Sequence, residues 1–325
     1  MLDLKIGLVS RHVGVPWLRQ TANGDGYVGA AQLMLNATDG VDALAVFDEP
    51  LKGQTTTVPI DRRILITGEP WNIKRYNVAY LNQFGTVISP YRHWGYRGRL
   101  LRSQTGLPWF YGLVFENGGL RVARNFEALE RQTPQPRRLA VSAVISAKKR
   151  TPMHRRRLAF IELLRQRIGN QLMLFGNGFE PIPDKADAID ACRYHLVLEN
   201  SADEHYWSEK LADAYLGWAL PIFSGTPSIG HYFPAGSYET LDTGDPASAV
   251  ETVVRLLALD PWQSRLPQLR EARHKLLYEH NYAVIIAKAA SKLSAANWAP
   301  GRPHEILGNG AATIGGRLQR ALLLK

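Results

Sequence analysis

Short apolar runs alternate with amphipathic stretches along the first third of the chain. Runs rich in β-branched residues predict strands, and apolar positions at helical spacing predict helices. We expect strands at 4–10, 43–49, 64–67 and 86–89, and helices at 24–35 and 74–84. Strands that alternate with helices favour a parallel sheet with crossover helices.

The alternation of predicted strands and helices is interrupted by two segments and then begins again. Residues 91–119 are aromatic-rich and irregular, and residues 127–138 are polar and punctuated by proline, which is typical of a linker. Five further strands are predicted at 139–146, 172–176, 194–200, 221–225 and 238–242. The helices predicted around them cover 154–168, 184–192, 208–216, 247–259 and 268–295.

This organisation predicts an α/β protein of two Rossmann-like domains facing a cleft, where such folds place their sites. We expect a first domain at 1–128, a second at 136–298 and a tail at 299–325. The terminal helices can return to brace the first domain.

The composition favours a cytoplasmic protein. The longest apolar stretch, Leu139–Ala147, is far too short to cross a bilayer. The N-terminus has acidic Asp3 before a short apolar run and no cleavage site of small residues, which indicates a first strand and not a signal peptide. The single cysteine, Cys192, excludes an internal disulfide.

The formal charge of +10 narrows the choice of partner. Nucleic acid, an anionic membrane surface and a phosphate-bearing small molecule could each account for it. The charge is densest at 148–150 and 154–157, where a strand meets a helix, and elsewhere it is mixed with acids. A focused cluster suits a diphosphate better than a long polyanion. The alternative function is that of a basic, non-enzymatic nucleic-acid-binding protein, but no RNA- or DNA-binding motif supports it.

Residues 194–210 carry the most specific chemistry. A buried strand ends at Glu199 and Asn200, a polar loop follows, and Ser208 is a predicted N-cap. Glu209 and Lys210 then occupy the first turn of a helix. The start of a helix favours anions, so a lysine there opposes the helix dipole and indicates a bound anion.

Four segments in order resemble the donor-site motif of the α1,3/4-fucosyltransferase family (glycosyltransferase family 10), bacterial type. They are LENS (198–201), YWSEK (206–210), DAY (213–215) and PIFSGTP (221–227). Ser208 stands where the family usually has threonine and keeps the hydroxyl. The resemblance implies a GT-B-like fold and inverting transfer of L-fucose from GDP-fucose to a saccharide hydroxyl. Transfer from another GDP-sugar is the alternative.

Two weaker resemblances complete the implied site. RLAF (157–160) resembles the family segment in which an arginine opens a helix, which implies that Arg157 binds phosphate, with Arg155 as the fallback. TGE (67–69) resembles the segment that carries the proposed catalytic base, which implies Glu69.

The resemblance also implies a role for individual residues of the donor site. Lys210 and the Tyr206 hydroxyl would stabilise the leaving diphosphate together with Arg157. Glu209 would hold the ribose hydroxyls, and Asn200 would shape the pocket. Because these cations come from the protein and no DxD motif is present, we expect no metal site and no required cofactor.

The acceptor is implied only broadly. Bacterial family members often act on lipopolysaccharide glycans, and the aromatic stretch at 90–112 could bind a saccharide or be a buried loop. The basic end of the tail supports no more than peripheral contact with the inner face of a membrane.

Several other polar and aromatic residues have simpler explanations. We expect Asp203, Glu204 and His205 to be exposed loop residues and His195 to be a core histidine. We expect packing roles for Tyr194, Trp218, Phe223 and Phe233.

Overall fold

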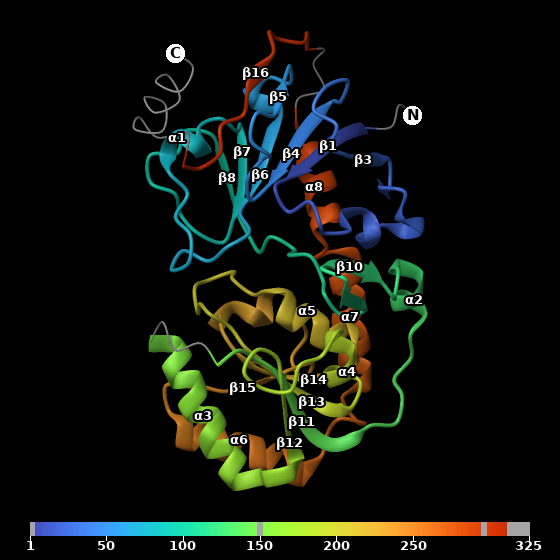
Figure 1. The fold of residues 1–325 in the computed structure, drawn as a ribbon, viewed down its shortest axis with the longest axis vertical. Helices are drawn as coiled ribbons and strands as arrows, with labels where there is room; N and C mark the ends of the chain where they lie inside the picture. The colour runs from blue at the N-terminus through green and yellow to red at the C-terminus, as the bar shows by residue number, and fades with distance from the viewer. Residues whose placement is uncertain (1–3, 148–151, 294–297, 311–325) are drawn as a thin grey trace. The chain divides into compact units, whose positions relative to one another are not determined.

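The computed structural model describes residues 4–147, 152–293 and 298–310. Contacts divide the chain into two compact units. Unit 1 comprises Met1–Leu107 and His280–Lys325, and unit 2 comprises Pro108–Glu279. Figure 1 shows the elements of each unit in chain order.

Unit 1 contains a seven-stranded sheet in the order β2-β3-β1-β4-β6-β7-β8. The sheet is parallel except for the pairing of β2 with β3. Most residues of β1, β4, β6 and β7 are buried, as expected for a parallel sheet covered on both faces. The strands are β1 (Leu4–Ser10), β2 (Tyr27–Val28), β3 (Ala31–Leu35), β4 (Ala43–Phe47), β6 (Arg63–Ile66), β7 (Thr86–Ser89) and β8 (Arg99–Arg102).

Of the two helices predicted for unit 1, one does not form and the other is shorter than predicted. Residues 24–35 form β2 and β3, because Gly26 has φ +85° and a Cβ there would lie 2.3 Å from the Leu33 carbonyl oxygen. The helix expected at 74–84 is only α1 (Val78–Leu81), because the Asn77 side chain caps it by accepting from the Tyr80 N–H. Short 3-10 turns lie at Trp17–Gln20, Ala22–Gly24 and Ile60–Arg62.

Helix α8 (Tyr282–Ala290) belongs to unit 1. Its buried Tyr282 and Ile286 share one hydrophobic cluster with strand residues such as Ala45. The last described segment also packs on this unit: β16 (His304–Glu305) pairs with β5 (Thr55–Thr56) and Ile306 is buried. The first part of the expected tail is therefore structured, while residues 311–325 lie outside the described ranges.

Unit 2 contains a five-stranded parallel sheet in the order β12-β11-β13-β14-β15. Helices α3 and α6 pack on each other, and α5 packs on α7 (Figure 1). The strands are β11 (Arg138–Val144), β12 (Leu172–Phe175), β13 (Cys192–Leu198), β14 (Leu220–Ser224) and β15 (Glu239–Thr240). The helices are α3 (Pro152–Ile168), α4 (Lys185–Ile189), α5 (Glu209–Leu216), α6 (Pro246–Leu259) and α7 (Leu266–Tyr278), with 3-10 turns at Gly169–Gln171 and Pro227–His231.

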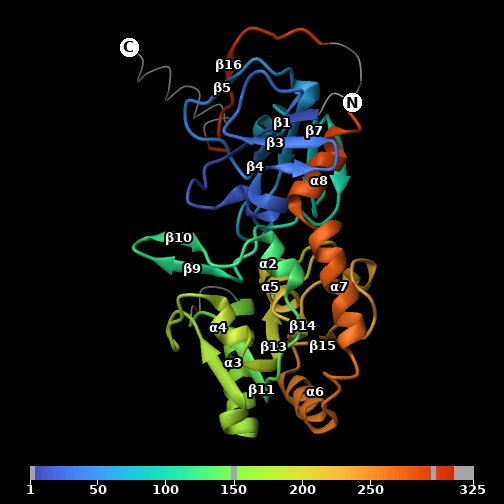
Figure 2. The same cartoon turned by 90° about the vertical axis from the view of Figure 1, so that its right-hand side faces the viewer.

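The boundaries between the units differ from those expected from the sequence. Unit 2 begins at Pro108 and ends at Glu279. Its start lies before the expected linker, because Trp109 and Tyr111 lie in its core and the Asp213 carboxylate accepts from two consecutive N–H groups at Phe110 and Tyr111. The expected linker begins with helix α2 (Phe126–Arg131), whose apolar side is buried in the same core. The hairpin of β9 (Leu113–Glu116) and β10 (Gly119–Val122) extends from unit 2 (Figure 2).

No helix in the described ranges is long and apolar enough to cross a membrane.

Candidate active site

The loop after β13 is closed by a buried carboxylate. Glu199, 5% exposed, follows the strand and accepts from the Ser208 N–H at 2.7 Å and from the Ser208 hydroxyl at 2.8 Å. The Ser208 hydroxyl in turn accepts from the Lys210 N–H, so the predicted N-cap is confirmed. The start of α5 is therefore fixed against the carboxyl end of the sheet.

Lys210 and Glu209 form a charged pair at this helix start. The Lys210 ammonium lies 2.9 Å from the Ser208 hydroxyl, 3.4 Å from a Glu199 oxygen and 3.5 Å from a Glu209 oxygen. Burial disfavours the charged ammonium, but Glu199 and Glu209 outweigh it and raise the pKa of Lys210. Lys210 is therefore a cation at neutral pH.

Glu209 is held as an anion. Burial favours its neutral form, but Lys210 and Lys185 outweigh burial and lower its pKa to about 2. The Lys185 ammonium lies 3.6 Å from Glu209 and 2.7 Å from Asp213. Lys185 is not recognisable as a site residue from the sequence, because only the packing of α4 against α5 brings it beside the donor motif.

Arg157 lies at the carboxyl end of the neighbouring strand. Its guanidinium is buried and donates to the Ser146 carbonyl oxygen at 2.9 Å, just beyond the end of β11. Its Nε has no acceptor among the residues that the structure describes, and burial lowers its pKa. Arg155 is exposed, so burial distinguishes these two candidate phosphate ligands. Residues 148–150 of the basic cluster lie outside the described ranges.

The sheet topology brings the predicted donor residues of unit 2 to one edge. Strands β11 and β13 are parallel neighbours, so their carboxyl ends coincide, and ligands of open α/β sheets bind at this edge. Arg157 reaches the end of β11, and half-buried Asn200 and buried Tyr206 lie in the loop after β13. Lys210 follows in the first turn of α5. This edge offers cations and a helix start to an anion.

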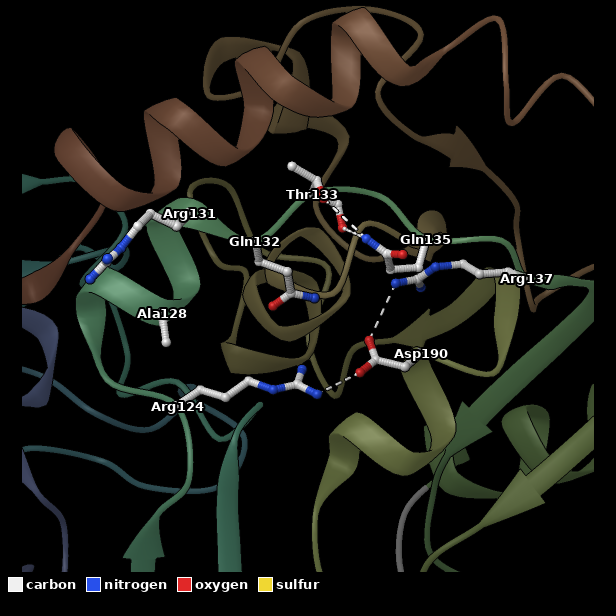
Figure 3. A pocket seen from close by; sticks show the side chains of 8 residues that line it. All are labelled: Arg124, Ala128, Arg131, Gln132, Thr133, Gln135, Arg137 and Asp190. Carbon is white, nitrogen blue, oxygen red and sulfur yellow. Dashed lines mark hydrogen bonds and ion pairs between the residues drawn. The ribbon is translucent and has the colours of Figure 1, made fainter.

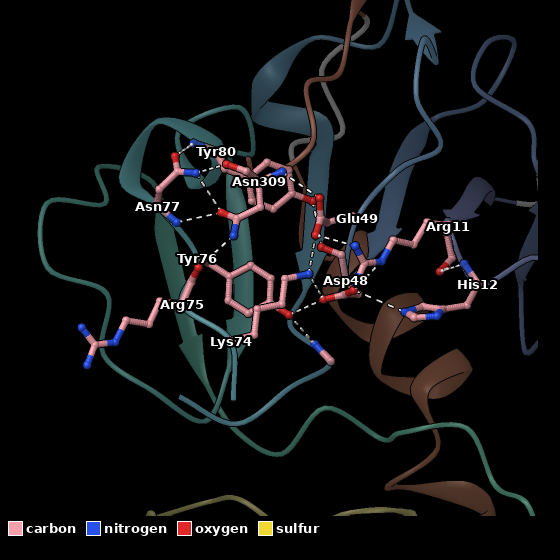
Figure 4. A network of polar contacts seen from close by, with 12 residues as sticks. Arg11, His12, Asp48, Glu49, Lys74, Arg75, Tyr76, Asn77, Tyr80 and Asn309 are labelled. Carbon is pink, nitrogen blue, oxygen red and sulfur yellow. Dashed lines mark hydrogen bonds and ion pairs between the residues drawn. The ribbon is translucent and has the colours of Figure 1, made fainter. Parts of the chain in front are cut away.

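Glu69 lies in unit 1, in the loop after β6. Its side chain is exposed. The preceding Gly68 N–H donates to the Tyr76 hydroxyl at 3.0 Å, and that hydroxyl donates to Asp48 at 2.5 Å (Figure 4). A chain of two hydrogen bonds thus fixes the residue before Glu69 to the carboxyl end of the adjacent strand, β4.

Asp48 is the centre of a polar network that was not predicted from the sequence. It is 1% exposed and lies 2.6 Å from the Lys74 ammonium and 3.3 Å from His12 Nε2 (Figure 4). Its φ of +63° is unusual for a residue other than glycine. Burial raises its pKa, but Lys74 and Tyr76 outweigh burial and hold the pKa below its ordinary value. The available signal was an acidic pair, 48–49, directly after a fully buried strand.

Most of the structural roles predicted for the histidines and the packing aromatic residues are confirmed. His195 is buried, its ring lies 2.8 Å from the Ser142 hydroxyl, and burial lowers its pKa to about 3, as expected of a neutral core histidine. His205 is half-buried and bonded to the Tyr232 hydroxyl at 2.7 Å, so its expected exposure is wrong. The remaining packing residues are buried, namely Tyr194, Trp218, Phe223 and Phe233. The described ranges contain no cluster of metal-ligating side chains.

One part of the aromatic stretch at 90–112 is buried, and another part is exposed and could bind a saccharide. Trp109 and Tyr111 are buried in the core of unit 2. Trp94 is 83% exposed, and Trp71, in the loop that carries Glu69, is 39% exposed with the Arg75 guanidinium 5.2 Å from its ring centre. The loops after β6 and β7 therefore present aromatic faces to solvent.

Comparison with known proteins supports the fold and gives a limited sequence match. No family model matches the chain. A fucosyltransferase-like protein of Arabidopsis thaliana is 28% identical over 79 residues, which are 24% of this chain and only 15% of that protein. The chain therefore matches well under two thirds of that relative.

Solved structures resemble a larger part of the chain. An α1,3-fucosyltransferase with GDP-fucose is similar with a TM-score of 0.50 and 16% identity over 92% of each chain. An α1,3-fucosyltransferase with GDP gives 0.48 and 18%, over 88% of this chain and 89% of that one. Together with the largely parallel sheet of unit 1 and the parallel sheet of unit 2, the similarity shows that the fold is of the GT-B class, as predicted.

Proposed function

We propose that the chain is an inverting glycosyltransferase that transfers L-fucose from GDP-fucose to a hydroxyl of a saccharide. The observation that carries this proposal is the grouping of Lys210, Glu209 and Arg157 at the carboxyl edge of the unit 2 sheet. The ordered motif between Leu198 and Pro227 and the limited match to a fucosyltransferase-like protein support the same assignment.

The donor diphosphate is bound by positive charge and by the helix start. The buried Arg157 guanidinium has an N–H without an acceptor among the described residues, and a phosphate oxygen would satisfy it. Lys210 and the Tyr206 hydroxyl complete the set. As the bond between the anomeric carbon and the diphosphate breaks, negative charge accumulates on the leaving oxygens, and fixed cations stabilise it.

The nucleoside end is held by Glu209. A carboxylate with a pKa of about 2 is ionised throughout the neutral range and accepts hydrogen bonds from the two ribose hydroxyls. Lys185 supports this role because its ammonium lies near Glu209 while its main contact is with Asp213. Asn200 shapes the pocket beside them.

Glu69 acts as the general base. The acceptor oxygen forms a bond to the anomeric carbon from the face opposite the diphosphate, its proton passes to the Glu69 carboxylate, and GDP leaves with the electrons of the broken bond. A sugar hydroxyl is a weak nucleophile, so accepting its proton lowers the barrier. Protein cations stabilise the leaving group, and we propose that no divalent metal takes part.

The acceptor is a glycan that stacks on exposed aromatic rings. Trp71 and Trp94 lie in loops that follow adjacent parallel strands, and Trp71 is two residues from Glu69. Aromatic faces suit the apolar faces of sugar rings. We propose a bacterial surface glycan, such as that of lipopolysaccharide, modified at the cytoplasmic side, where the basic end of the chain would make peripheral contact with lipid.

A donor screen tests the proposal. GDP release is followed with GDP-fucose, other GDP-sugars and UDP-sugars in the presence of a mixed glycan pool. Acceptor-dependent release from GDP-fucose supports the proposal, and faster release from another GDP-sugar changes the donor but keeps the site. Failure of every GDP-sugar to bind or react would contradict it.

A further inference from the structure

Charged side chains also gather outside the donor site. In unit 2 they line a cavity of about 480 Å³, where Asp190 pairs with Arg124 at 2.8 Å and with Arg137 at 3.3 Å (Figure 3). One terminal nitrogen of Arg137 donates to backbone carbonyl oxygens and the other to Asp190, so these charges brace the amino ends of β11 and β13. In unit 1 they form the Asp48 network, which lies at the carboxyl end of the sheet beside the loop of Glu69 (Figure 4).

The hydroxyl of Tyr76 connects Asp48 with the backbone at Glu69. Asp48 is ionised at neutral pH and can only accept, so the Tyr76 hydroxyl donates to it at 2.5 Å. The oxygen of this hydroxyl then accepts from the Gly68 N–H at 3.0 Å and also from the Glu69 N–H. Tyr76 is only 5% exposed. One buried hydroxyl thus holds two consecutive peptide groups, and the second belongs to the proposed base.

The turn before Glu69 is held from the neighbouring strand as well. The Thr67 hydroxyl donates to the hydroxyl of Ser89, the last residue of β7, at 3.0 Å, and both residues are buried. A Cβ at Gly68 would lie 3.3 Å from the Asp48 Cβ, which is closer than ordinary packing allows. The turn therefore lies directly against β4, and the direction in which the Glu69 side chain leaves the backbone is fixed.

Tyr76 is itself held by a residue near the end of the described chain. The side-chain amide of Asn309 donates to the Arg75 carbonyl oxygen at 2.8 Å and accepts from the Asn77 N–H at 2.8 Å. It therefore bonds to both neighbours of Tyr76 in the sequence (Figure 4). The Asn309 N–H in turn donates to Glu49 at 2.8 Å. These contacts fix the loop after β6 to a segment more than 230 residues later in the chain.

We propose that Tyr76 is a positioning residue for the general base, held in place by Asp48 and Asn309. In this role, which rests on the proposed function, Tyr76 acts through Glu69 and not on the substrate. A base accepts a proton only when its oxygen is within hydrogen-bond reach of the reacting hydroxyl. A displacement of about 1 Å can cost about a hundredfold in rate. Loss of the Tyr76 hydroxyl should therefore lower kcat and leave substrate affinity unchanged.

Steady-state kinetics of the full chain test this role, with the donor and the acceptor that a donor screen identifies. Tyr76→Phe keeps the ring, and kcat should fall about ten- to hundredfold while GDP affinity and the acceptor KM change less than about twofold. Tyr80→Phe is the matched control, because its equally buried hydroxyl donates to the Asp48 carbonyl oxygen at 2.9 Å. We expect parental kcat in this control. Equal kcat in the two variants would overturn the proposal.

Asn309→Ala tests the second anchor without a change in the core. We expect kcat to fall about tenfold, again with little change in KM or GDP affinity. Asn82→Ala is its control, because it removes a comparable amide contact in unit 1, to the Arg97 N–H at 3.1 Å. The control should turn over like the parent. Parental kcat in Asn309→Ala would show that Asn309 has no positioning role.

A double-mutant cycle shows whether Tyr76 acts through Glu69. In the Glu69→Gln background, Tyr76→Phe should change kcat by less than about twofold, because the base that it positions is already absent. Losses that multiply in the double variant would overturn the proposal. Absence of turnover by the parent with every GDP-sugar would instead contradict the proposed function, so the two failures are distinct.

Discussion

The Lys210 ammonium lies 3.4 Å from a carboxylate oxygen of Glu199, a residue that is itself buried at the end of β13. Glu199 also accepts from the N–H and the hydroxyl of Ser208, so one carboxylate holds both the cap of α5 and the lysine in its first turn. The lysine is thereby kept charged and its position is fixed before any ligand arrives. Such preorganisation lowers the cost of binding a diphosphate.

Replacing Lys210 by Ala should therefore weaken GDP binding. A charge-assisted contact contributes about 1.5–3 kcal/mol, so we expect an affinity roughly ten- to hundredfold lower by calorimetry. Lys210→Arg keeps the charge and should recover part of the loss. Lys275→Ala, which removes the partner of Glu279 on α7, is the control and should bind GDP like the parent. Parent-like affinity in Lys210→Ala would remove the lysine from the donor site.

Glu209→Gln should distinguish the contribution of the ribose to GDP binding from that of the diphosphate. The amide no longer offers two anionic acceptors to the ribose, so GDP affinity should fall about tenfold. Pyrophosphate has no ribose, and the loss of a negative charge near Lys210 should leave its affinity equal or higher. The measurement compares both ligands by calorimetry. A parallel loss of GDP and pyrophosphate binding would place Glu209 elsewhere in the mechanism.

Glu69→Gln should abolish most turnover and leave donor binding unchanged. The amide has nearly the same shape but cannot accept a proton, and loss of a general base costs about 10²–10⁴-fold in rate. Turnover and GDP affinity are measured on the same preparation. Glu116→Gln, on the exposed hairpin, is the control. Should the Glu69 variant turn over at the parental rate, the base is another residue.

Activity should survive exhaustive treatment with EDTA. The leaving group is stabilised by protein cations in the proposed mechanism, so removal of divalent ions leaves the catalytic charges in place. Turnover is measured before and after treatment, and again after addition of manganese or magnesium. Complete loss that manganese alone restores would contradict the prediction.

Asp48→Asn should destabilise the protein in a pH-dependent way. The folded pKa of Asp48 lies below its ordinary value of 3.8, so the ionised carboxylate stabilises the fold above that value, and the contribution is lost as the pH falls through the folded pKa. We expect a loss of about 3 kcal/mol near neutral pH. The parent and the variant should converge in strong acid.

Urea denaturation at several pH values checks this expectation. Asp61→Asn changes an exposed carboxylate of the same unit and should alter the free energy of unfolding by less than about 0.5 kcal/mol. A constant difference between parent and Asp48→Asn at all pH values would show that ionisation of Asp48 is not the cause.

The sequence by itself determined features that depend on neighbouring residues. Buried apolar runs predicted β1, β4, β6 and β7 of the first sheet and all five strands of the unit 2 sheet. Ser208 was identified as the cap of α5 from the residues around it. The order of the donor motif was likewise visible, because its segments follow one another along the chain from the end of β13 through α5 to β14. The prediction failed at 24–35, where Gly29, with a φ of +60°, lies in the turn between β2 and β3 and the chain forms a hairpin instead of a helix.

Only the tertiary structure decided which distant residues meet. Lys185 reaches Glu209 through helix packing, and Asp48 gathers Lys74 and Tyr76 from a loop 26–28 residues away. Burial distinguished Arg157 from its exposed neighbour Arg155, although both are arginines in one basic run. The unit boundary at Leu107 also followed from long-range packing. These features depend on contacts between separate elements, which no local pattern of side chains encodes.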